Sequence, residues 1–219
     1  IVLFRNGSDY MRKGTVLSIK SLKIGNFIAK NNVLVILVAL FIAGIAAGTF
    51  SYHKVHILAE YSNTYIERFI SQRFESSFFS VVLNSFMESM LMLLILFTFG
   101  TSMMGVILAP FSLFARGVLY GGVTALLYSD YSVKGIAFNA VLVLPPAILL
   151  ISALLLASRE SVRFSLIIAK MSLPGSSPFN LSVDFRSYCG RYLFITLLVL
   201  ASALTDAVLS CSFMSGLKL

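Results

Sequence analysis

The chain consists of long uncharged stretches separated by shorter polar ones. The uncharged or nearly uncharged stretches are residues 33–50, 90–109, 111–128, 136–157 and 192–213. A helix of about 20 apolar residues is long enough to cross the hydrocarbon core of a bilayer, which is roughly 30 Å thick. The pattern therefore predicts an all-α membrane bundle of five transmembrane helices. Pro110 is predicted to end the second helix, because proline has no amide hydrogen to donate.

Residues 51–89, between the first two stretches, have the pattern of an amphipathic helix. Apolar side chains recur at steps of three and four residues, and charged side chains fill the gaps. The apolar face either rests on the lipid interface and the ends of the spans or docks a partner outside the cytoplasm. The candidate docking residues are Phe69, Phe74 and Phe78. Residues 158–170 have a similar pattern beside basic residues and are predicted to lie flat on anionic lipid.

Composition excludes a soluble enzyme. Of the 219 residues, 58% are apolar and 12% are charged, and the mean hydropathy is +0.92. The charged share is about half that of an ordinary globular domain. Because no linker divides them, residues 33–219 are expected to form one membrane domain. Residues 1–32 form a basic segment before it, in which residues 1–10 precede Met11 and are interpreted as an upstream extension.

The excess of positive charge indicates the orientation of the chain in the membrane. The formal charge is +8, from 17 Lys and Arg against 9 Asp and Glu. In a membrane protein such an excess marks cytoplasmic segments, so we do not interpret it as a nucleic-acid site. Basic residues gather before residue 33 and again after residue 157. Both segments lie in the cytoplasm only if four spans separate them, which predicts five spans with the N-terminus inside and the C-terminus outside.

Two charged residues lie within the predicted spans, Arg116 and Asp206. An ionisable group inside a membrane is a functional candidate, because burying it is costly. Counted at about 1.5 Å per residue, the two lie roughly 8 and 21 Å from the cytoplasmic edge, too far apart to pair. Arg116 is predicted to extend to the cytoplasmic headgroups, and Asp206 to bond Asn139 or Lys134. The alternative for Asp206, a proton or ion site, needs further acids at the same depth.

Glycines and prolines inside the spans indicate how the helices pack. Gly105, Gly117 and Gly121 belong to small-residue faces, and the last two are one helical turn apart. Such faces let helix backbones approach closely, which predicts tight packing of the second and third spans and allows self-association. Pro145 breaks the hydrogen-bond ladder of the fourth span, which must kink or unwind there.

The sequence contains no recognisable catalytic equipment. It lacks a phosphate-binding loop, the serine-hydrolase and zinc-protease motifs, and paired intramembrane aspartates. Its two cysteines are far apart and offer no metal-ligand spacing. We therefore expect a protein that is not an enzyme and that uses no cofactor or metal.

An ordered series of small residues, prolines and charges runs through the middle of the chain. It comprises Gly100-Thr101-Ser102-Met103-Met104-Gly105, Pro110, Arg116-Gly117, Gly121, Lys134-Gly135 and Leu144-Pro145. The series resembles the core of the stage II sporulation protein M family, most closely over residues 75–170. A basic N-terminus, a larger segment after the first span and an acid in the outer half of the last span agree with it.

This resemblance implies an integral membrane protein of endospore-forming bacteria, in the mother-cell or septal membrane. It further implies a non-catalytic scaffold for two extracytoplasmic cell-wall hydrolases, in a complex that remodels peptidoglycan during engulfment. The competing hypothesis is the permease subunit of an ATP-driven exporter. In that case residues 158–170 would couple to the ATPase, and the kinked fourth span and Arg116 would line the route.

Overall fold

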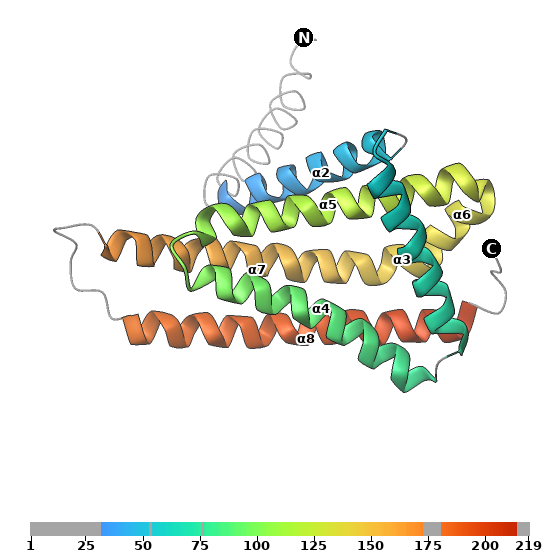
Figure 1. The fold of residues 1–219 in the computed structure, drawn as a ribbon. Coiled ribbons are helices and arrows are strands. Elements are labelled where there is room, and N and C mark those ends of the chain that lie inside the picture. The colour runs from blue at the N-terminus through green and yellow to red at the C-terminus, as the bar shows by residue number, and fades with distance from the viewer. Residues whose placement is uncertain (1–31, 53, 76, 173–180, 214–219) are drawn as a thin grey trace, which may run out of the picture. The chain divides into compact units, whose positions relative to one another are not determined.

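The structure is a computed structural model that describes residues 32–52, 54–75, 77–172 and 181–213. The described elements are helices α2 (Asn32–Ser51), α3 (His56–Glu75), α4 (Phe78–Gly100), α5 (Gly105–Asp130), α6 (Ser132–Phe138), the π-helical turn η1 (Asn139–Val143), α7 (Leu144–Met171) and α8 (Leu181–Phe213) (Figure 1). Backbone contacts divide the chain into two units, residues 1–36 and 37–219. Of the first unit only the start of α2 is described, so the predicted basic segment and upstream extension lie outside the described residues.

Five helical stretches of the described chain are long and apolar enough to cross a membrane. They are Asn32–Ser51, Phe78–Gly100, Gly105–Asp130, Val133–Met171 and Ser182–Ser212. The predicted all-α membrane bundle with five spans is therefore confirmed. The inside and outside ends of the bundle stay a prediction.

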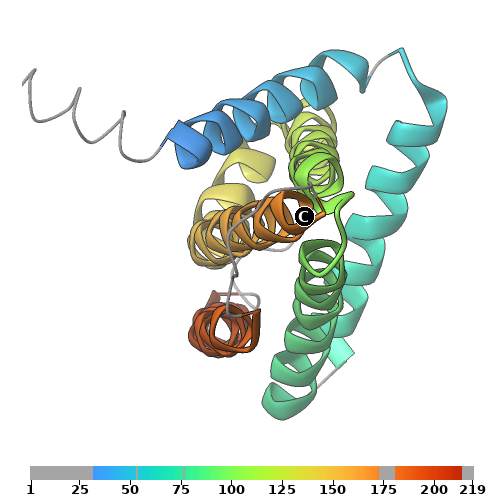
Figure 2. The ribbon, with the colours of Figure 1, turned by 90° about the vertical axis from the view of Figure 1, so that its left-hand side faces the viewer.

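Helix α7 occupies the middle of the second unit. It packs against α4, α5 and α8, and α3 crosses the bundle near one end (Figures 1 and 2). The turn from α4 to α5 lies at the same end as the close of α7 and the start of α8, and α3 and α6 lie at the other (Figure 1). This arrangement agrees with the alternation of crossings that the sequence predicted.

The break between the second and third spans falls at residues 101–104 and not at Pro110. Helix α5 continues through Pro110, so the predicted helix end there is wrong. A membrane helix tolerates proline when neighbours satisfy the freed backbone groups. The actual turn is held by Ser165 of α7, whose hydroxyl donates to the Ser102 carbonyl at 2.6 Å and accepts from the Val106 amide at 3.1 Å. These bonds satisfy backbone groups that a helix end leaves unpaired.

The fourth span unwinds where the sequence predicts it. The π-helical turn η1 directly precedes Pro145 and Pro146, at the start of α7. Proline cannot donate to the carbonyl one turn earlier, and a wider turn accommodates the interrupted ladder. Ser202 of α8 donates to the Pro146 carbonyl at 2.7 Å. The structure thus has an irregular, wider helical turn next to Pro145, where the sequence predicted a kink or an unwinding.

Residues 158–170 are not a separate surface helix. They continue α7 without a break to Met171. Ser158, Ser161 and Phe164 are buried in this stretch, and Ser161 donates to the Leu96 carbonyl at 2.7 Å. The prediction that this stretch lies flat on lipid is wrong, because its side chains pack between α4 and α8.

Gly117 and Gly121 of α5 face α2 and not α4. A Cβ atom at Gly117 would lie 2.6 Å from the Phe41 carbonyl oxygen and 3.2 Å from the Gly44 Cα. A Cβ atom at Gly121 would overlap the Ile45 carbonyl. The second and third spans were expected to meet through these residues, but the first span offers glycines at the same four-residue step and forms the contact instead. Gly105 has another role, since a Cβ there would overlap the Phe99 carbonyl in the α4–α5 turn.

The amphipathic segment divides into α3 and the first half of α4. Helix α3 packs against α5, and its apolar face closes a core cluster of Tyr52, Ile66, Val123, Ala125, Leu126, Leu127, Phe138 and Leu142. The apolar face was predicted either to rest on the lipid interface and the ends of the spans or to dock a partner. In the described residues it packs on the ends of the spans.

Candidate functional site

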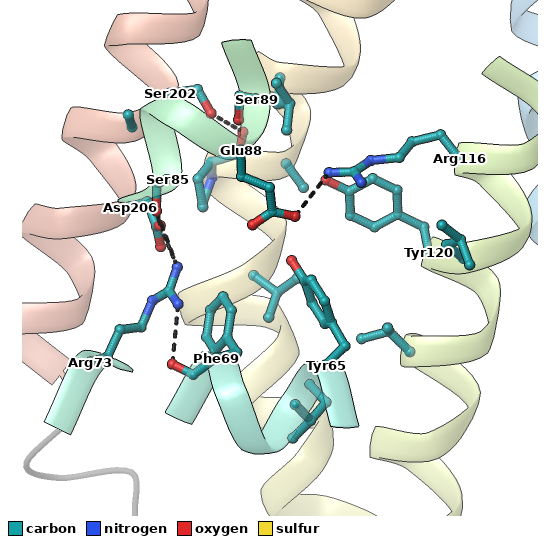
Figure 3. A pocket seen from close by; sticks show the side chains of 18 of the residues that line it. Tyr65, Phe69, Arg73, Ser85, Glu88, Ser89, Arg116, Tyr120, Ser202 and Asp206 are labelled. Carbon is teal, nitrogen blue, oxygen red and sulfur yellow. Dashed lines mark hydrogen bonds and ion pairs between the residues drawn. The ribbon is translucent and has the colours of Figure 1, made fainter. Parts of the chain in front are cut away.

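A cavity of ≈ 80 Å³ lies between α3, α4, α5, α7 and α8. Its polar lining consists of Tyr61, Tyr65, Arg73, Ser85, Glu88, Ser89, Arg116, Tyr120, Ser202 and Asp206 (Figure 3). Its other walls are mainly apolar, and the volume is enough for several water molecules. The cavity brings together four ionisable side chains, Arg73, Glu88, Arg116 and Asp206, of which all but Glu88 are largely buried. Because such groups are costly to bury in a helical membrane bundle, this cavity is the candidate functional site.

Helical periodicity brings these side chains to the cavity. Residues three or four apart on a helix share one face. The contributing sets are Tyr65, Phe69 and Arg73 on α3; Ser85, Glu88 and Ser89 on α4; Arg116, Tyr120 and Val123 on α5; and Ser202 and Asp206 on α8. Each helix therefore presents one short polar or mixed stripe to the same space.

Arg73 and Asp206 form a closed ion pair that fastens α3 to α8. One terminal guanidinium nitrogen contacts the Asp206 carboxylate, and Ser85 donates to the same carboxylate oxygen. Arg73 Nε donates to Ser210 Oγ at 3.0 Å, and Nη1 donates to the Phe69 carbonyl at 3.1 Å. The side chains of Arg73 and Asp206 are only 7% and 8% exposed. Each guanidinium nitrogen has a partner, as a buried charge requires.

Arg116 and Glu88 form a second, open pair on the other side of the cavity. Arg116 Nη2 lies 3.7 Å from Glu88 Oε1, and the two side chains are 16% and 54% exposed. That separation is too long for a hydrogen bond. Arg116 Nε is buried and has no hydrogen-bond partner among the described residues. The guanidinium also lies over the Tyr120 ring, 5.6 Å from its centroid.

Tyr65 stands beside this pair and points into the cavity (Figure 3). Burial raises the pKa of the Tyr65 phenol, and the negative charge of Glu88 raises it further. The phenol is therefore neutral and remains a hydrogen-bond donor at physiological pH.

Both intramembrane charges have partners other than those predicted. Asp206 pairs with Arg73, and the predicted partner Asn139 donates instead to the Tyr128 hydroxyl at 3.0 Å. Arg116 turns into the cavity toward Glu88, so its predicted extension to cytoplasmic headgroups is wrong. The sequence correctly predicted that Arg116 and Asp206 do not pair with each other, since each of them pairs with a third residue.

Sequence reasoning missed Arg73 and Glu88. Both were assigned to the segment outside the membrane, where charged residues need no explanation. A signal existed for Glu88, because α4 begins at Phe78 and Glu88 is the first charged residue of that helix. A local signal existed for Arg73 too, because it lies at four-residue steps from Phe69 and Tyr65 on one face of α3. Its partner on α8 was not predictable from that spacing.

The three phenylalanines proposed for docking do not form one exposed face. Phe69 is turned inward, with its ring centroid 6.0 Å from that of Phe138. Phe78 is 45% exposed at the start of α4. Phe74 lies on the last turn of α3, but its side chain is outside the described part of the chain. Docking at Phe78 stays a prediction.

A second buried charge lies at the opposite end of the bundle. The side chain of Glu160 on α7 is 10% exposed and contacts Arg191 of α8, and Arg163 lies 3.5 Å away. Arg163 and Arg191 are each 50% exposed. Because both arginines reach solvent, this cluster is interpreted as a tie between α7 and α8.

Five helical stretches long and apolar enough to span a membrane, and a cavity lined by charged side chains between α3, α4, α5, α7 and α8, define the class: a multi-pass α-helical membrane protein with an internal polar site. The family model of stage II sporulation protein M matches residues 18–211, which is most of the chain. The chain therefore belongs to the stage II sporulation protein M family, and this membership makes it a sporulation membrane protein. No curated protein and no solved structure matches the chain.

Proposed function

We propose that the protein is a non-catalytic membrane scaffold that holds extracytoplasmic cell-wall hydrolases during sporulation engulfment. Family membership supports the link to sporulation. The observation that carries the proposal is the position of α3, which is fastened to the bundle by one face while its other face is exposed.

The outer face of α3 is defined here by Ile57, Glu60, Thr64, Glu67 and Arg68. All five are exposed, and Ile57 is 78% exposed. On the inner face, Ile66 is 2% exposed and Arg73 is held by Asp206. A helix that is already rigid loses little conformational freedom when a partner binds it. This favours α3 as a platform on the side of the membrane where the cell wall lies.

The outer face of α3 is mainly polar, with Ile57 beside Thr64 and three charged side chains, which is the composition of the rim of a protein interface. Phe78 and Phe79 extend it at the start of α4, where they are 45% and 74% exposed. The docking surface proposed from the sequence is thus shifted from Phe69 to the opposite face of the same helix.

Affinity purification tests the proposal. The tagged full chain is purified from membranes of its sporulating host in mild detergent, and co-purifying proteins are identified by mass spectrometry. We expect peptidoglycan hydrolases with the unmodified chain, and their loss with the variants Ile57→Glu and Arg68→Glu. Lys170→Glu is the matched control, because Lys170 is exposed at the opposite end of the bundle.

Each variant is first checked for an unchanged elution volume and melting temperature, so that loss of a partner is not loss of the fold. Hydrolases absent from the unmodified sample, or retained in full by both α3 variants, would contradict the proposal.

The cavity favours a second candidate, the permease subunit of an ATP-driven exporter. The π-helical turn η1 and the start of α7 line the cavity through Val143 and Pro146, and irregular helical turns also line the substrate routes of transporters. The predicted coupling helix at residues 158–170 is part of α7, which weakens this alternative. The same purification decides: a nucleotide-binding subunit and ATP hydrolysis in the eluate would favour the exporter.

A further inference from the structure

The two ion pairs of the cavity differ in how completely their arginines are bonded. Each guanidinium nitrogen of Arg73 has a partner: Ser210 for Nε, the Phe69 carbonyl for Nη1, and Asp206 with Ser85 for Nη2. Arg116 Nε has no hydrogen-bond partner in the described residues, although it is buried. Leaving a buried donor of a charged group unbonded is unfavourable, so Arg73 has a structural role and Arg116 has spare capacity.

Glu88 does not supply the hydrogen-bond acceptor that Arg116 lacks. Its carboxylate lies 3.7 Å from the nearest Arg116 nitrogen, beyond hydrogen-bond distance, and its side chain is 54% exposed. A guanidinium forms its strongest bonds with two parallel N–H groups directed at one carboxylate or phosphate. Figure 3 shows Arg116 and Glu88 facing each other across the space that Tyr65 and Tyr120 enter. These two phenols add hydroxyl donors on the same side.

Beyond these polar groups the cavity is apolar. Its remaining walls include Ile66, Leu119, Val123, Val143, Ala147 and Leu150. A site with a few convergent donors and otherwise apolar walls suits a small ligand with one polar end.

We infer that Arg116 anchors a binding site for an oxyanion, a phosphate or carboxylate group, which displaces the Glu88 carboxylate from Arg116 and takes donors from Tyr65 and Tyr120. The apolar walls suit the first carbons of a lipid that carries such a group, and the arginine would equally bind the free anion. The inference does not depend on the scaffold proposal, because it concerns the purified protein without its partners.

The test uses the full chain purified in dodecyl maltoside, a detergent without phosphate or carboxylate. Binding of dioleoylphosphatidylglycerol is measured by native mass spectrometry, with dioleoylglycerol as the probe that lacks the anion. Binding of inorganic phosphate is measured by equilibrium dialysis. We expect Arg116→Gln to weaken the binding of the anionic probe by about tenfold or more, the loss typical of a charged hydrogen bond. Arg186→Gln, at an exposed position of α8 that is not part of the cavity lining, should leave it unchanged.

Glu88→Gln provides a readout with the opposite sign. It removes the negative charge that competes for Arg116, so anion binding should become tighter. A purely structural role of the Arg116–Glu88 pair does not produce this gain. If Arg116→Gln fails to fold, Glu88→Gln alone decides.

The two probes separate the sources of the anion. Arg116-dependent binding of phosphatidylglycerol without binding of inorganic phosphate assigns the site to a lipid headgroup, and binding of both assigns it to an oxyanion of either origin. Affinity for both probes that is unchanged in Arg116→Gln, or unchanged or weaker in Glu88→Gln, would overturn the inference.

Discussion

At the scale of single residues, the cavity contains two ion pairs with different roles. One is structural, and the arginine of the other is available to a ligand. The Arg73–Asp206 pair is buried, and each guanidinium nitrogen of Arg73 has a hydrogen-bond partner. The charged groups of Arg116 and Glu88 lie beyond hydrogen-bond distance and are partly exposed. The sequence identified Asp206 and Arg116 as unusual because a charge in an apolar stretch is conspicuous. It did not identify their partners, because Arg73 and Glu88 lie on segments that look polar.

The closed pair gives the first prediction. Asp206→Leu leaves Arg73 buried without a counter-charge and should lower the free energy of unfolding by about 3–5 kcal/mol. The double variant Arg73→Met with Asp206→Leu should recover most of this loss, because both charges are then gone. Thermal unfolding in detergent measures both effects.

The matched control is the exposed pair of His56 and Glu60, which lie 3.9 Å apart. Glu60→Gln should change stability by less than about 1 kcal/mol. A double variant as unstable as Asp206→Leu alone would show that the loss comes from the missing pair and not from an unpaired buried charge.

At the scale of elements, helix ends follow tertiary contacts more closely than they follow apolar runs. The sequence placed one boundary at Pro110, and the structure places it at residues 101–104. An apolar run shows only that a helix is compatible with lipid. The boundary falls where Ser165 of another helix is available to bond the exposed backbone.

The α4–α5 turn gives the second prediction. Ser165→Ala removes its bonds to the Ser102 carbonyl and the Val106 amide. It should cost about 1 kcal/mol, because the partly buried Val106 amide loses its partner while the Ser102 carbonyl keeps the Gly105 amide. Ser152→Ala is the control, since Ser152 is exposed and bonds only the Ile148 carbonyl of its own helix. Equal melting temperatures for the two variants would contradict this account of the turn.

The contact of α2 with α5 gives the third prediction. Gly121→Leu places a side chain where the Ile45 carbonyl lies, and should destabilise the protein by about 1–3 kcal/mol or more through overpacking. Gly190→Leu is the control, because a Cβ atom there meets nothing within 4 Å. Thermal unfolding should separate the two, and an equal melting temperature would show that this close approach is unimportant.

At the scale of the whole molecule, the crossings alternate between two ends. The α4–α5 turn lies at one end and α3 at the other (Figure 1). Positive charge predicts that the first end is cytoplasmic, because Arg159, Arg163 and Arg191 lie there. The arrangement of the helices does not show which end is cytoplasmic, so the predicted orientation rests on the asymmetry of positive charge.

Cysteine labelling in intact cells tests the orientation, after Cys189 and Cys211 are replaced by serine. A cysteine at Arg68 should react with a membrane-impermeant maleimide. One at Met103, which is 50% exposed in the α4–α5 turn, should react only after the membrane is permeabilised. The opposite pattern would invert the topology and place α3 in the cytoplasm, away from the cell wall.

The sequence by itself determined the all-helical class, the five spans, the unwinding at Pro145 and the family. These depend on local properties: the length of apolar runs, the missing amide of proline, and an ordered series of residues. Only the tertiary structure decided that Arg73 meets Asp206, that Glu88 meets Arg116, and that Gly117 and Gly121 face α2. A periodic pattern shows which side chains share a face, but the neighbour of that face depends on how distant helices cross, and no local interaction encodes that crossing.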